Sequence, residues 1–506
     1  MAIKKSELYS KLWQSCDKLR GGMEASQYKD YILTFLFLKY VSDKYANEKI
    51  PEFIIPQGCT FEDISALKNM PSIKDEEGKI NSSIGDKLNK ILGKIAEANQ
   101  LNGIIDQVDF NDETKLGNDK DKLGKLTKLI AIFEDLNFYN NKANDDDILG
   151  DAYEYLISHF AKESGKDKGE FYTPSEVSRL ISQIIGIDLQ SVQGNTTFYD
   201  PTCGSGSLLL KLIEYAGKGT IYGQEKYSVT AGLCILNMIL HGNSTAEIKS
   251  GNTLSEPKHL KNGALQTFDY VVANPPFSDK DWTTGIQPNQ DIYDRFKLGI
   301  PPEKNGDYAF LLHIIASLKP HGKGACILPH GVLFRGNTEG EIRKNIIQKG
   351  YIKGIIGLPA NLFYGTGIPA CIIILDKENA QNRTHIFMLD ASKSFVKDGN
   401  KNRLREQDIH KIADAFNKQI NIEKYSRLVP ISEIQSEKNN YNLNIPRYID
   451  TKNDEDIQDI YAHLHGGIPN IDIEKLKDYW QEMPTLKRFC FHRIQKIIKK
   501  ITVLLI

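Results

Sequence analysis

Residues 197–216 read TFYDPTCGSGSLLLKLIEYA, and this stretch decides the fold class. The β-branched and aromatic run at 197–200 predicts a buried strand, and the apolar residues after Ser207 predict a helix. Gly204 and Gly206, in the turn between them, let the backbone approach a ligand closely, and the helix N-terminus offers amides to its polar groups. Alone, such a turn is weak evidence of function, because strand-to-helix turns also use glycine structurally.

Similar strand and helix patterns alternate after this unit. Short β-branched or apolar runs predict strands at 220–224, 247–250, 268–273, 325–328, 352–357 and 370–375. Apolar residues at helical spacing predict helices at 174–185, 229–241, 308–318 and 339–348. Strands that alternate with helices usually join in one parallel sheet, so this order predicts an α/β domain.

The chain divides into three predicted parts. Residues 1–145 form a helical domain, with apolar residues at helical spacing in segments 6–20, 28–44, 87–98 and 123–136. The α/β pattern occupies residues 146–426, and residues 427–506 return to loops and helices.

Composition and charge exclude several classes of protein. With 506 residues, 40% of them hydrophobic and 25% charged, the chain is not of the disordered or collagen-like type. The seven cysteines are scattered and lack zinc-site spacing, so we expect no metal. There is no signal-peptide pattern and no apolar run long enough to span a bilayer, so we expect a cytoplasmic protein without membrane contact. The net charge of −1 means that any nucleic acid must be held by local patches or by a partner.

Two acidic residues follow predicted strands, where ligands of open α/β sheets bind. Glu225 lies 19 residues after Gly206, at the end of the next strand, and can accept hydrogen bonds from ribose hydroxyls. A dinucleotide would favour a third glycine where Leu209 stands, and Asp200 would repel a pyrophosphate but attract an ammonium group. An adenosine cofactor that carries an amino acid therefore fits best.

A second motif, Asn274-Pro275-Pro276-Phe277, directly follows the predicted strand at 268–273. The amide oxygen of Asn274 and the carbonyl of Pro275 can both accept hydrogen bonds from one exocyclic amine, because the prolines stiffen the backbone and remove competing donors. Phe277 then offers a flat face for a planar heterocycle. The alternative is a proline-rich strand end with an aromatic core residue.

Together these motifs resemble the S-adenosylmethionine-dependent DNA amino-methyltransferases. Further stretches resemble the modification (M) subunit of type I restriction-modification systems: GEFYTP at 169–174, ILPHGVLFRG at 327–336, NLFY at 361–364 and YNLNIPRY at 441–448. The resemblance implies a Rossmann-like methyltransferase domain with an all-α N-terminal domain and a C-terminal helical segment. It also implies a site-specific adenine-N6 DNA methyltransferase.

The resemblance also implies roles for individual residues. Asn274, Pro275, Pro276 and Phe277 would hold a target adenine that is flipped out of the duplex. Tyr172 and Thr173 would hold the methionine part of the cofactor, with Glu170 in the same set, and Asp200 would pair with its amino group. The turn with Thr202, Gly204, Ser205 and Gly206 would pass beneath the cofactor. Glu225 would bind the ribose, and Asn252 and Thr253 would flank the adenine, although many relatives carry Asp where Asn252 stands.

The implied partners are DNA, a specificity subunit, a restriction subunit and a second copy of the chain. No long target-recognition domain follows the second motif, and no Gly-x-x-x-x-Gly-Lys-Ser/Thr loop for ATP is present, so these tasks would belong to other subunits. A helical segment at 464–483 would pack on the specificity subunit, whereas the basic, apolar tail beyond about residue 486 departs from the family pattern.

Several alternatives stay open at this point. The same motif logic serves protein methyltransferases that act on glutamine amides, although these are generally shorter and lack the helical domain. A catalytically silent scaffold is a further reading. Trp282, in the loop after Phe277, is a candidate contact for the extruded base or for a strand. His330 and Arg335 either face DNA phosphates or lie in a loop without such contacts.

Overall fold

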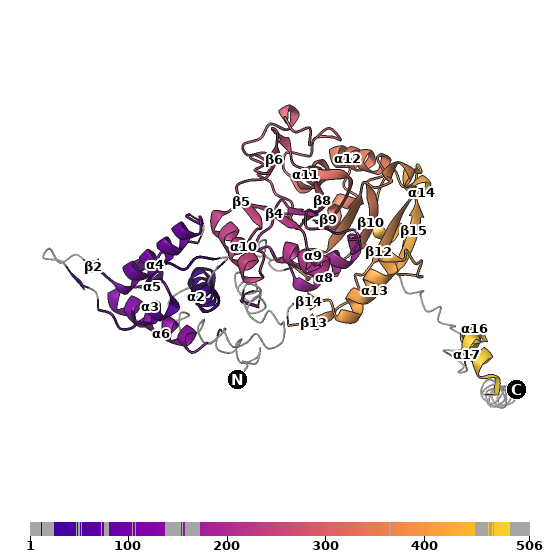
Figure 1. Cartoon of the computed structure of the whole chain (residues 1–506). Coiled ribbons are helices and arrows are strands. Elements are labelled where there is room, and N and C mark those ends of the chain that lie inside the picture. The colour runs from indigo at the N-terminus through magenta and orange to yellow at the C-terminus, as the bar shows by residue number, and fades with distance from the viewer. Residues whose placement is uncertain are drawn as a thin grey trace. The chain divides into compact units, whose positions relative to one another are not determined.

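The computed structural model comprises two compact units, residues 1–450 and 451–506 (Figure 1). The structure describes residues 12, 25–46, 48, 51, 53–71, 73–74, 80–103, 105–106, 108–136, 153, 155–156, 173–363, 366–399, 401–450, 464, 468 and 470–485. No helix in these parts of the chain is long and apolar enough to cross a lipid bilayer.

The N-terminal part is helical, as predicted. Its elements are α2 (Ala25–Tyr45), α3 (Phe61–Ser65), α4 (Ile84–Ala98), α5 (Glu113–Leu116), α6 (Asp119–Glu134) and the short hairpin β1 (Ile73–Lys74) with β2 (Ile80–Ser82). Ser83 and Asp86 form a capping box that fixes the start of α4, and Asn118 caps α6. The predicted helices at 28–44, 87–98 and 123–136 are thus confirmed with shifted ends. The one predicted at 6–20 lies outside the described residues, Leu12 excepted.

Helix α2 packs against both the helical part and the α/β part of the chain. Phe35, Leu36 and Phe37 are fully buried, so α2 is apolar around most of its circumference. Its core also includes Leu233 and Leu236 of α10 (Ser228–Leu240). The Tyr40 hydroxyl donates to the backbone carbonyl of residue 240 at 3.3 Å, so α2 packs directly on a helix of the α/β domain.

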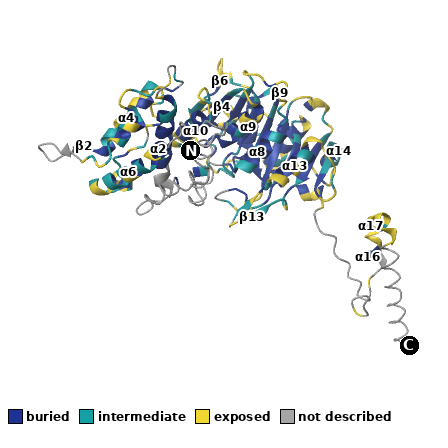
Figure 2. Cartoon of the chain, turned by 60° about the horizontal axis from the view of Figure 1, so that its bottom comes forward, coloured by how far each residue is buried: buried dark blue, intermediate teal, exposed yellow. Residues whose placement is uncertain are grey.

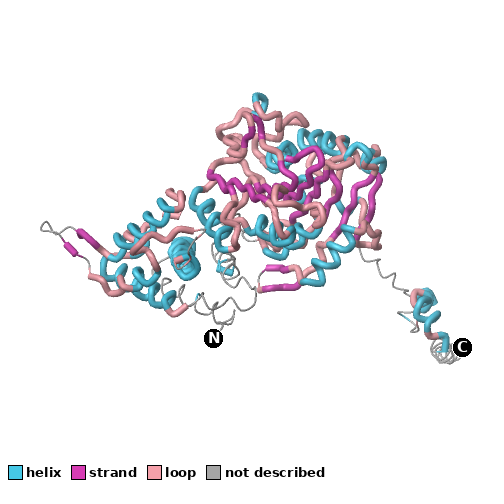
Figure 3. Tube along the Cα trace, viewed as in Figure 1, coloured by secondary structure: helices cyan, strands magenta, loops and turns pink. Residues whose placement is uncertain are grey.

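A nine-stranded sheet forms the centre of the α/β domain (Figure 3). Its order is β15 (Ser426–Pro430), β12 (His385–Asp390), β10 (Ile352–Gly357), β11 (Ala370–Asp376), β9 (Leu318–Pro329), β8 (Phe268–Ala273), β3 (Thr197–Asp200), β4 (Thr220–Glu225) and β5 (Glu247–Ser250). The remaining strands form the hairpins β6 (Leu260–Lys261) with β7 (Ala264–Leu265) and β13 (Val396–Asp398) with β14 (Lys401–Arg403).

The sheet is mixed rather than parallel, which corrects the sequence prediction. Strand β11 is antiparallel to both β9 and β10, and β15 is antiparallel to β12. A parallel neighbour requires a crossover connection, usually a helix, and the segment 358–369 between β10 and β11 contains no helix among its described residues. Strands β12 and β15 and helix α13 (Glu406–Asn417) were not predicted from the sequence.

Alternating side chains of the strands fill two cores, one on each face of the sheet. Most of the central sheet is coloured as buried in Figure 2. In β8, Tyr270 and Val272 belong to the core shared with α8 (Ser175–Ile184), α9 (Ser207–Ala216) and α13. Val271 and Ala273 belong to the core shared with α11 (Asp307–Ser317) and α12 (Asn337–Gln348). The architecture is therefore a three-layer α/β/α fold, and the predicted class is confirmed.

Residues 427–450 pack with this sheet. Besides β15 they include α14 (Ile431–Gln435), and Leu443, Ile445 and Tyr448 lie in the core. The second unit contains the short helices α16 (Asn470–Glu474) and α17 (Lys477–Glu482).

The strand order places a ligand site. The chain runs outward from β3 through β4 to β5 and then returns to β8 on the other side of β3. Both β4 and β8 are parallel to β3, so the carboxyl ends of these strands share one edge of the sheet. Ligands of open α/β sheets bind where the strand order reverses in this way. The turn after Asp200 and the motif that begins at Asn274 are therefore neighbours.

Candidate functional site

Two carboxylates hold the turn that follows β3. Asp200 Oδ1 accepts the Thr202 N–H at 2.9 Å. Glu225 Oε2 accepts the Gly204 N–H at 3.1 Å, and Oε1 accepts the Tyr227 N–H at 3.0 Å. Both predicted acidic residues therefore lie at this turn and fix its backbone.

Two buried amides that the sequence analysis missed also support the site. Asn237 Nδ2 on α10 donates to the backbone carbonyl of Ser205 at 2.9 Å. Gln224 Nε2 donates to the carbonyls of Gly251 and Glu256, which fixes the segment after β5. Asn237 interrupts the apolar run LCILNMIL, and this lone amide was a usable sequence signal. Gln224 carries no comparable signal.

The turn is electrostatically suited to a cation. Asp200 is only 2% exposed, and burial raises its pKa to about 8, with the Glu225 charge adding to the rise and the Thr202 N–H opposing it. Burial also raises the pKa of Glu225. In the described part of the chain neither carboxylate has a salt-bridge partner. A bound ammonium group would stabilise the ionised form of Asp200.

Gly206 ends the turn, at a position where no side chain fits. Its φ is +82°, and an added Cβ would lie 2.6 Å from Met238 Cε and 2.7 Å from Cys234 Sγ. Gly217, at the other end of α9, has a similar φ of +76° but nothing within 4 Å of an added Cβ. Alanine substitutions at Gly206 and Gly217 therefore separate the cost of backbone strain, which both share, from the cost of crowding, which only Gly206 has.

We therefore expect Gly206→Ala to destabilise the protein more than Gly217→Ala. The left-handed backbone costs about 1–2 kcal/mol at both positions. Crowding adds about 1–3 kcal/mol at Gly206 alone. Urea unfolding followed by circular dichroism measures the difference, and equal losses in the two variants would contradict the tight fit of the turn.

Asn274 directly follows β8. Among the described residues, the nitrogen of its side-chain amide has a hydrogen-bond partner and the oxygen has none. Nδ2 donates to Thr173 Oγ1 at 3.2 Å, which joins the segment before α8 to the motif after β8. Oδ1 is buried and has no hydrogen-bond partner among the residues that the structure describes. A buried acceptor without a partner is costly unless a ligand satisfies it. The unpaired oxygen is the atom that the sequence analysis assigns to the amine of the target base.

Phe277 and the residue after it are held by neighbouring elements. The Phe277 ring meets Phe363 edge to face, with centroids 5.8 Å apart. Ser278 has a φ of +55°, and its N–H donates to Asp307 Oδ1 at 2.7 Å. Asp307 Oδ2 in turn accepts from Arg335 Nη1 at 2.8 Å. Phe277 therefore lies in a segment that is held before the ring by the hydrogen bond from Asn274 to Thr173 and after it by the hydrogen bond from Ser278 to Asp307.

The contacts of three further residues indicate their roles. Trp282 is 1% exposed, packs against Phe296 and donates from Nε1 to the Pro302 carbonyl at 2.9 Å, so the idea that it holds an extruded base is wrong. Arg335 pairs with Asp307 and Glu339, and His330 Nε2 lies 2.9 Å from the Ala370 carbonyl. These contacts favour a structural role for Arg335 and His330.

The segment after β5 contains the two residues predicted to flank adenine. Asn252 Oδ1 accepts the Leu254 N–H at 3.0 Å, and the buried Thr253 donates from Oγ1 to the Pro201 carbonyl at 2.5 Å. They therefore lie beside the turn after β3. Glu170 and Tyr172 lie outside the described residues.

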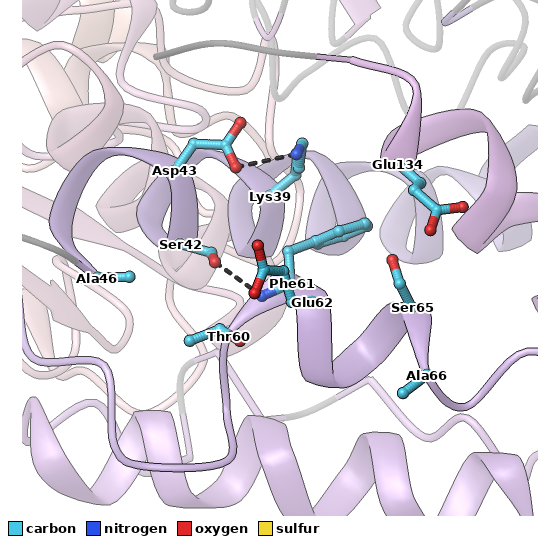
Figure 4. A pocket seen from close by; sticks show the side chains of 10 residues that line it. All are labelled: Lys39, Ser42, Asp43, Ala46, Thr60, Phe61, Glu62, Ser65, Ala66 and Glu134. Carbon is cyan, nitrogen blue, oxygen red and sulfur yellow. Dashed lines mark hydrogen bonds and ion pairs between the residues drawn. The ribbon is translucent and has the colours of Figure 1, made fainter.

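A separate cavity of about 800 Å³ lies in the helical domain (Figure 4). Ten residues of α2, α3, α6 and the neighbouring turns line it: Lys39, Ser42, Asp43, Ala46, Thr60, Phe61, Glu62, Ser65, Ala66 and Glu134. Lys39 pairs with Asp43 at 2.9 Å and lies over the Phe61 ring. None of the residues assigned to cofactor or base lines this cavity.

Two family models and several known proteins are similar to this chain over most of its length. The N-6 DNA Methylase family model matches residues 144–457, and the HsdM N-terminal domain model matches residues 8–133. The Type I restriction enzyme MpnII methylase subunit of Mycoplasma pneumoniae is 32% identical, over 92% of this chain and 93% of its own. The MjaVII methylase subunit of Methanocaldococcus jannaschii is 33% identical, over 88% and 78%. The crystal structure of a type I restriction-modification methyltransferase subunit from Streptococcus thermophilus superposes with a TM-score of 0.76 at 34% identity, covering 89% of this chain and 100% of that one.

Proposed function

The chain belongs to the N-6 DNA methylase family and, within it, to the methylase subunits of type I restriction enzymes, and from this premise we propose which of its residues hold cofactor and target base. Its function is N6-methylation of adenine in DNA within a restriction-modification system. The match of the helical domain to a type I family model disfavours the glutamine-amide alternative.

The residues around the turn after β3 fit S-adenosylmethionine. Asp200 offers a buried carboxylate that has no salt-bridge partner among the described residues, which suits the amino group of the cofactor. Gly206 leaves no room for a side chain beneath the turn, and we assign Glu225, which the Gly204 and Tyr227 amides hold, to the ribose hydroxyls. When bound, S-adenosylmethionine supplies a methyl group already activated on a sulfonium. We assign Thr202 and Ser205 to the same turn, and Glu170, Tyr172 and Thr173 to the methionine end.

The protein contributes mainly by positioning the target base. The unpaired Oδ1 of Asn274 is the single observation that carries the assignment, because it is a buried acceptor at the switch point of the sheet. We assign it, together with the Pro275 carbonyl, to the exocyclic amine of an adenine extruded from the duplex. These two acceptors localise the nitrogen lone pair, while Pro276 stiffens the motif and Phe277 stacks on the base.

The proposed partners follow from the same membership. A specificity subunit selects the DNA sequence, a restriction subunit performs cleavage, and a second copy of this chain completes the methylase. The net charge of −1 supports this division, since the chain lacks the basic excess expected of an autonomous DNA binder. We assign residues 1–145 to the N-terminal domain and the C-terminal segment beyond residue 450 to contacts with partners. Residues 427–450, predicted as part of that segment, join the catalytic domain predicted at 146–426, because β15 and the chain after it pack with its sheet.

The test is transfer of labelled methyl from S-adenosylmethionine to duplex DNA, with the chain alone and with its specificity subunit, followed by digestion to nucleosides. We expect N6-methyladenine in the presence of the specificity subunit and at most trace label without it. Label on protein or on cytosine would overturn the substrate assignment. Cofactor binding without any transfer in the complete complex would instead support a silent scaffold.

A further inference from the structure

The long loop that follows the motif at 274–277 is tied at its base. The Ser278 N–H donates to Asp307 Oδ1 at 2.7 Å, and the Gly306 N–H donates to the Asp279 carbonyl at 2.8 Å. The two ends of this loop therefore lie together. Residues 279–306 form a single closed loop that starts directly after the motif at 274–277, which is the side of the site assigned to the target base.

Arg295, inside this loop, is a buried cation with a dedicated partner. It is 3% exposed, and its Nη2 lies 2.6 Å from Asp291 Oδ1, while Nε lies 3.1 Å from both carboxylate oxygens. Asp291 Oδ2 also accepts the Arg295 backbone N–H at 2.8 Å. The Arg295 Cζ lies 5.4 Å from the ring centroids of both Tyr293 and Phe296. Its orientation is thus fixed from within the loop.

The remaining donors of Arg295 reach out of the loop to the segment after β5. Nη2 donates to the Leu254 carbonyl at 2.8 Å, and Nη1 donates to the Thr253 carbonyl at 3.3 Å. On its other side this segment is held by the bond from Thr253 Oγ1 to the Pro201 carbonyl. Two successive peptide planes are therefore fixed between the turn after β3 and one guanidinium.

A planar guanidinium can hold two carbonyls at once, whereas an ammonium group acts as a point charge. Burying such a cation costs desolvation energy that only well-placed acceptors offset. An ordinary loop contact does not require this arrangement, since apolar packing would secure the loop without a buried charge. The arrangement fixes the backbone of Thr253, and with it that of the adjacent Asn252.

We propose that Arg295, held by Asp291, is a positioning residue for the nucleoside end of the cofactor and links the loop on the target side to the cofactor site. The inference rests on the proposed function, and within it we assign Asn252 and Thr253 to the adenine ring of the cofactor, as the family resemblance implies. Its consequence is that loss of Arg295 weakens cofactor binding more than it slows the transfer step.

The experiment compares Arg295→Met, Arg295→Lys and Asp291→Asn in the complex with the specificity subunit. We expect Arg295→Met to raise the KM and the dissociation constant for S-adenosylmethionine about tenfold or more, with kcat changed less than about threefold. Arg295→Lys keeps the positive charge but loses the planar guanidinium, and Asp291→Asn weakens the ion pair that orients Arg295. Both variants should therefore show intermediate increases in the KM and the dissociation constant, of about threefold to tenfold.

Arg383 provides the matched control. It is a largely buried arginine that donates to the backbone carbonyls of Gly350, Asp376 and Glu378, at the opposite edge of the sheet from the site. Arg383→Met should lower the melting temperature, like Arg295→Met, and leave KM for the cofactor unchanged.

A fall in kcat at unchanged KM in the Arg295 variants would overturn the inference, as would an equal rise of KM in Arg383→Met. Should Arg295→Met fail to fold, the two milder variants decide by the same split between KM and kcat. If the wild-type complex itself binds no S-adenosylmethionine, the proposed function fails, and this result is distinct from a failure of the Arg295 role alone.

Discussion

Replacing Asn274 by alanine should lower the rate of methyl transfer to DNA by about 10²–10³-fold, because it removes a fixed acceptor from the reacting amine. Cofactor affinity should change less than about threefold, because among the described residues the Asn274 amide makes no hydrogen bond to the turn after β3, and its loss removes only one neutral hydrogen bond to Thr173 at the methionine end. Single-turnover transfer of labelled methyl measures the rate, and calorimetry measures the affinity. The expected pattern is the opposite of that for Arg295.

Asn417 offers a control for this variant. Its amide donates from Nδ2 to the Gln183 carbonyl at 3.0 Å, and it lies on α13, away from the motif and from the loop at 279–306. Asn417→Ala should retain nearly full transfer. Substantial activity in Asn274→Ala would remove this residue from the reaction, whereas equal losses in both variants would point to a general loss of structure.

Replacing Asp200 by asparagine should weaken cofactor binding by about 100-fold at pH 8, because it removes one partner of a buried charge pair. The pH dependence provides the sharper test. The pKa of Asp200 is about 8 in the protein without cofactor, so at lower pH a proton must leave before an ammonium group can pair with the carboxylate. Between pH 7 and pH 6 the dissociation constant of wild type should therefore rise about tenfold.

The affinity should also fall above pH 8, since the α-amino group of the cofactor, with a pKa of about 7.7–8.0, loses its charge there. The optimum near pH 8 thus arises from one group on each partner. In Asp200→Asn the decline toward pH 6 should disappear. If it persists in the variant, another group controls it, and Asp200 is not the partner of the amino group.

The same shift predicts how the protein without cofactor responds to pH. Because the folded-state pKa is raised from 3.8 to about 8, the folded protein holds a proton that the unfolded chain releases. The contribution of Asp200 to stability is therefore greatest below pH 4 and is lost as pH rises toward 8. Bound cofactor should reverse this trend.

Much of the site was predictable because it depends on short stretches of chain. The strand at 197–200, the Gly-x-Gly turn and the helix after Ser207 follow from side chains within a few residues of one another. The same holds for the strand at 268–273 and for Asn274, whose place at the end of this strand is local. Residue patterns and backbone preferences act over such distances, so the sequence by itself determined the fold class and most of the candidate residues.

The tertiary structure alone decided how these stretches meet. Strand β11 lies between β9 and β10, and its antiparallel direction follows from the connection at 358–369, whose described residues form no crossover helix, not from its own apolar residues. Thr173 and Asn274 are 101 positions apart and meet because α8, which follows Thr173, packs on the same core as β8. Arg295 lies in a loop without regular periodicity, and its role follows from two carbonyls more than 40 positions away. Hydrogen bonds between distant segments are set by chain topology, which no local pattern encodes.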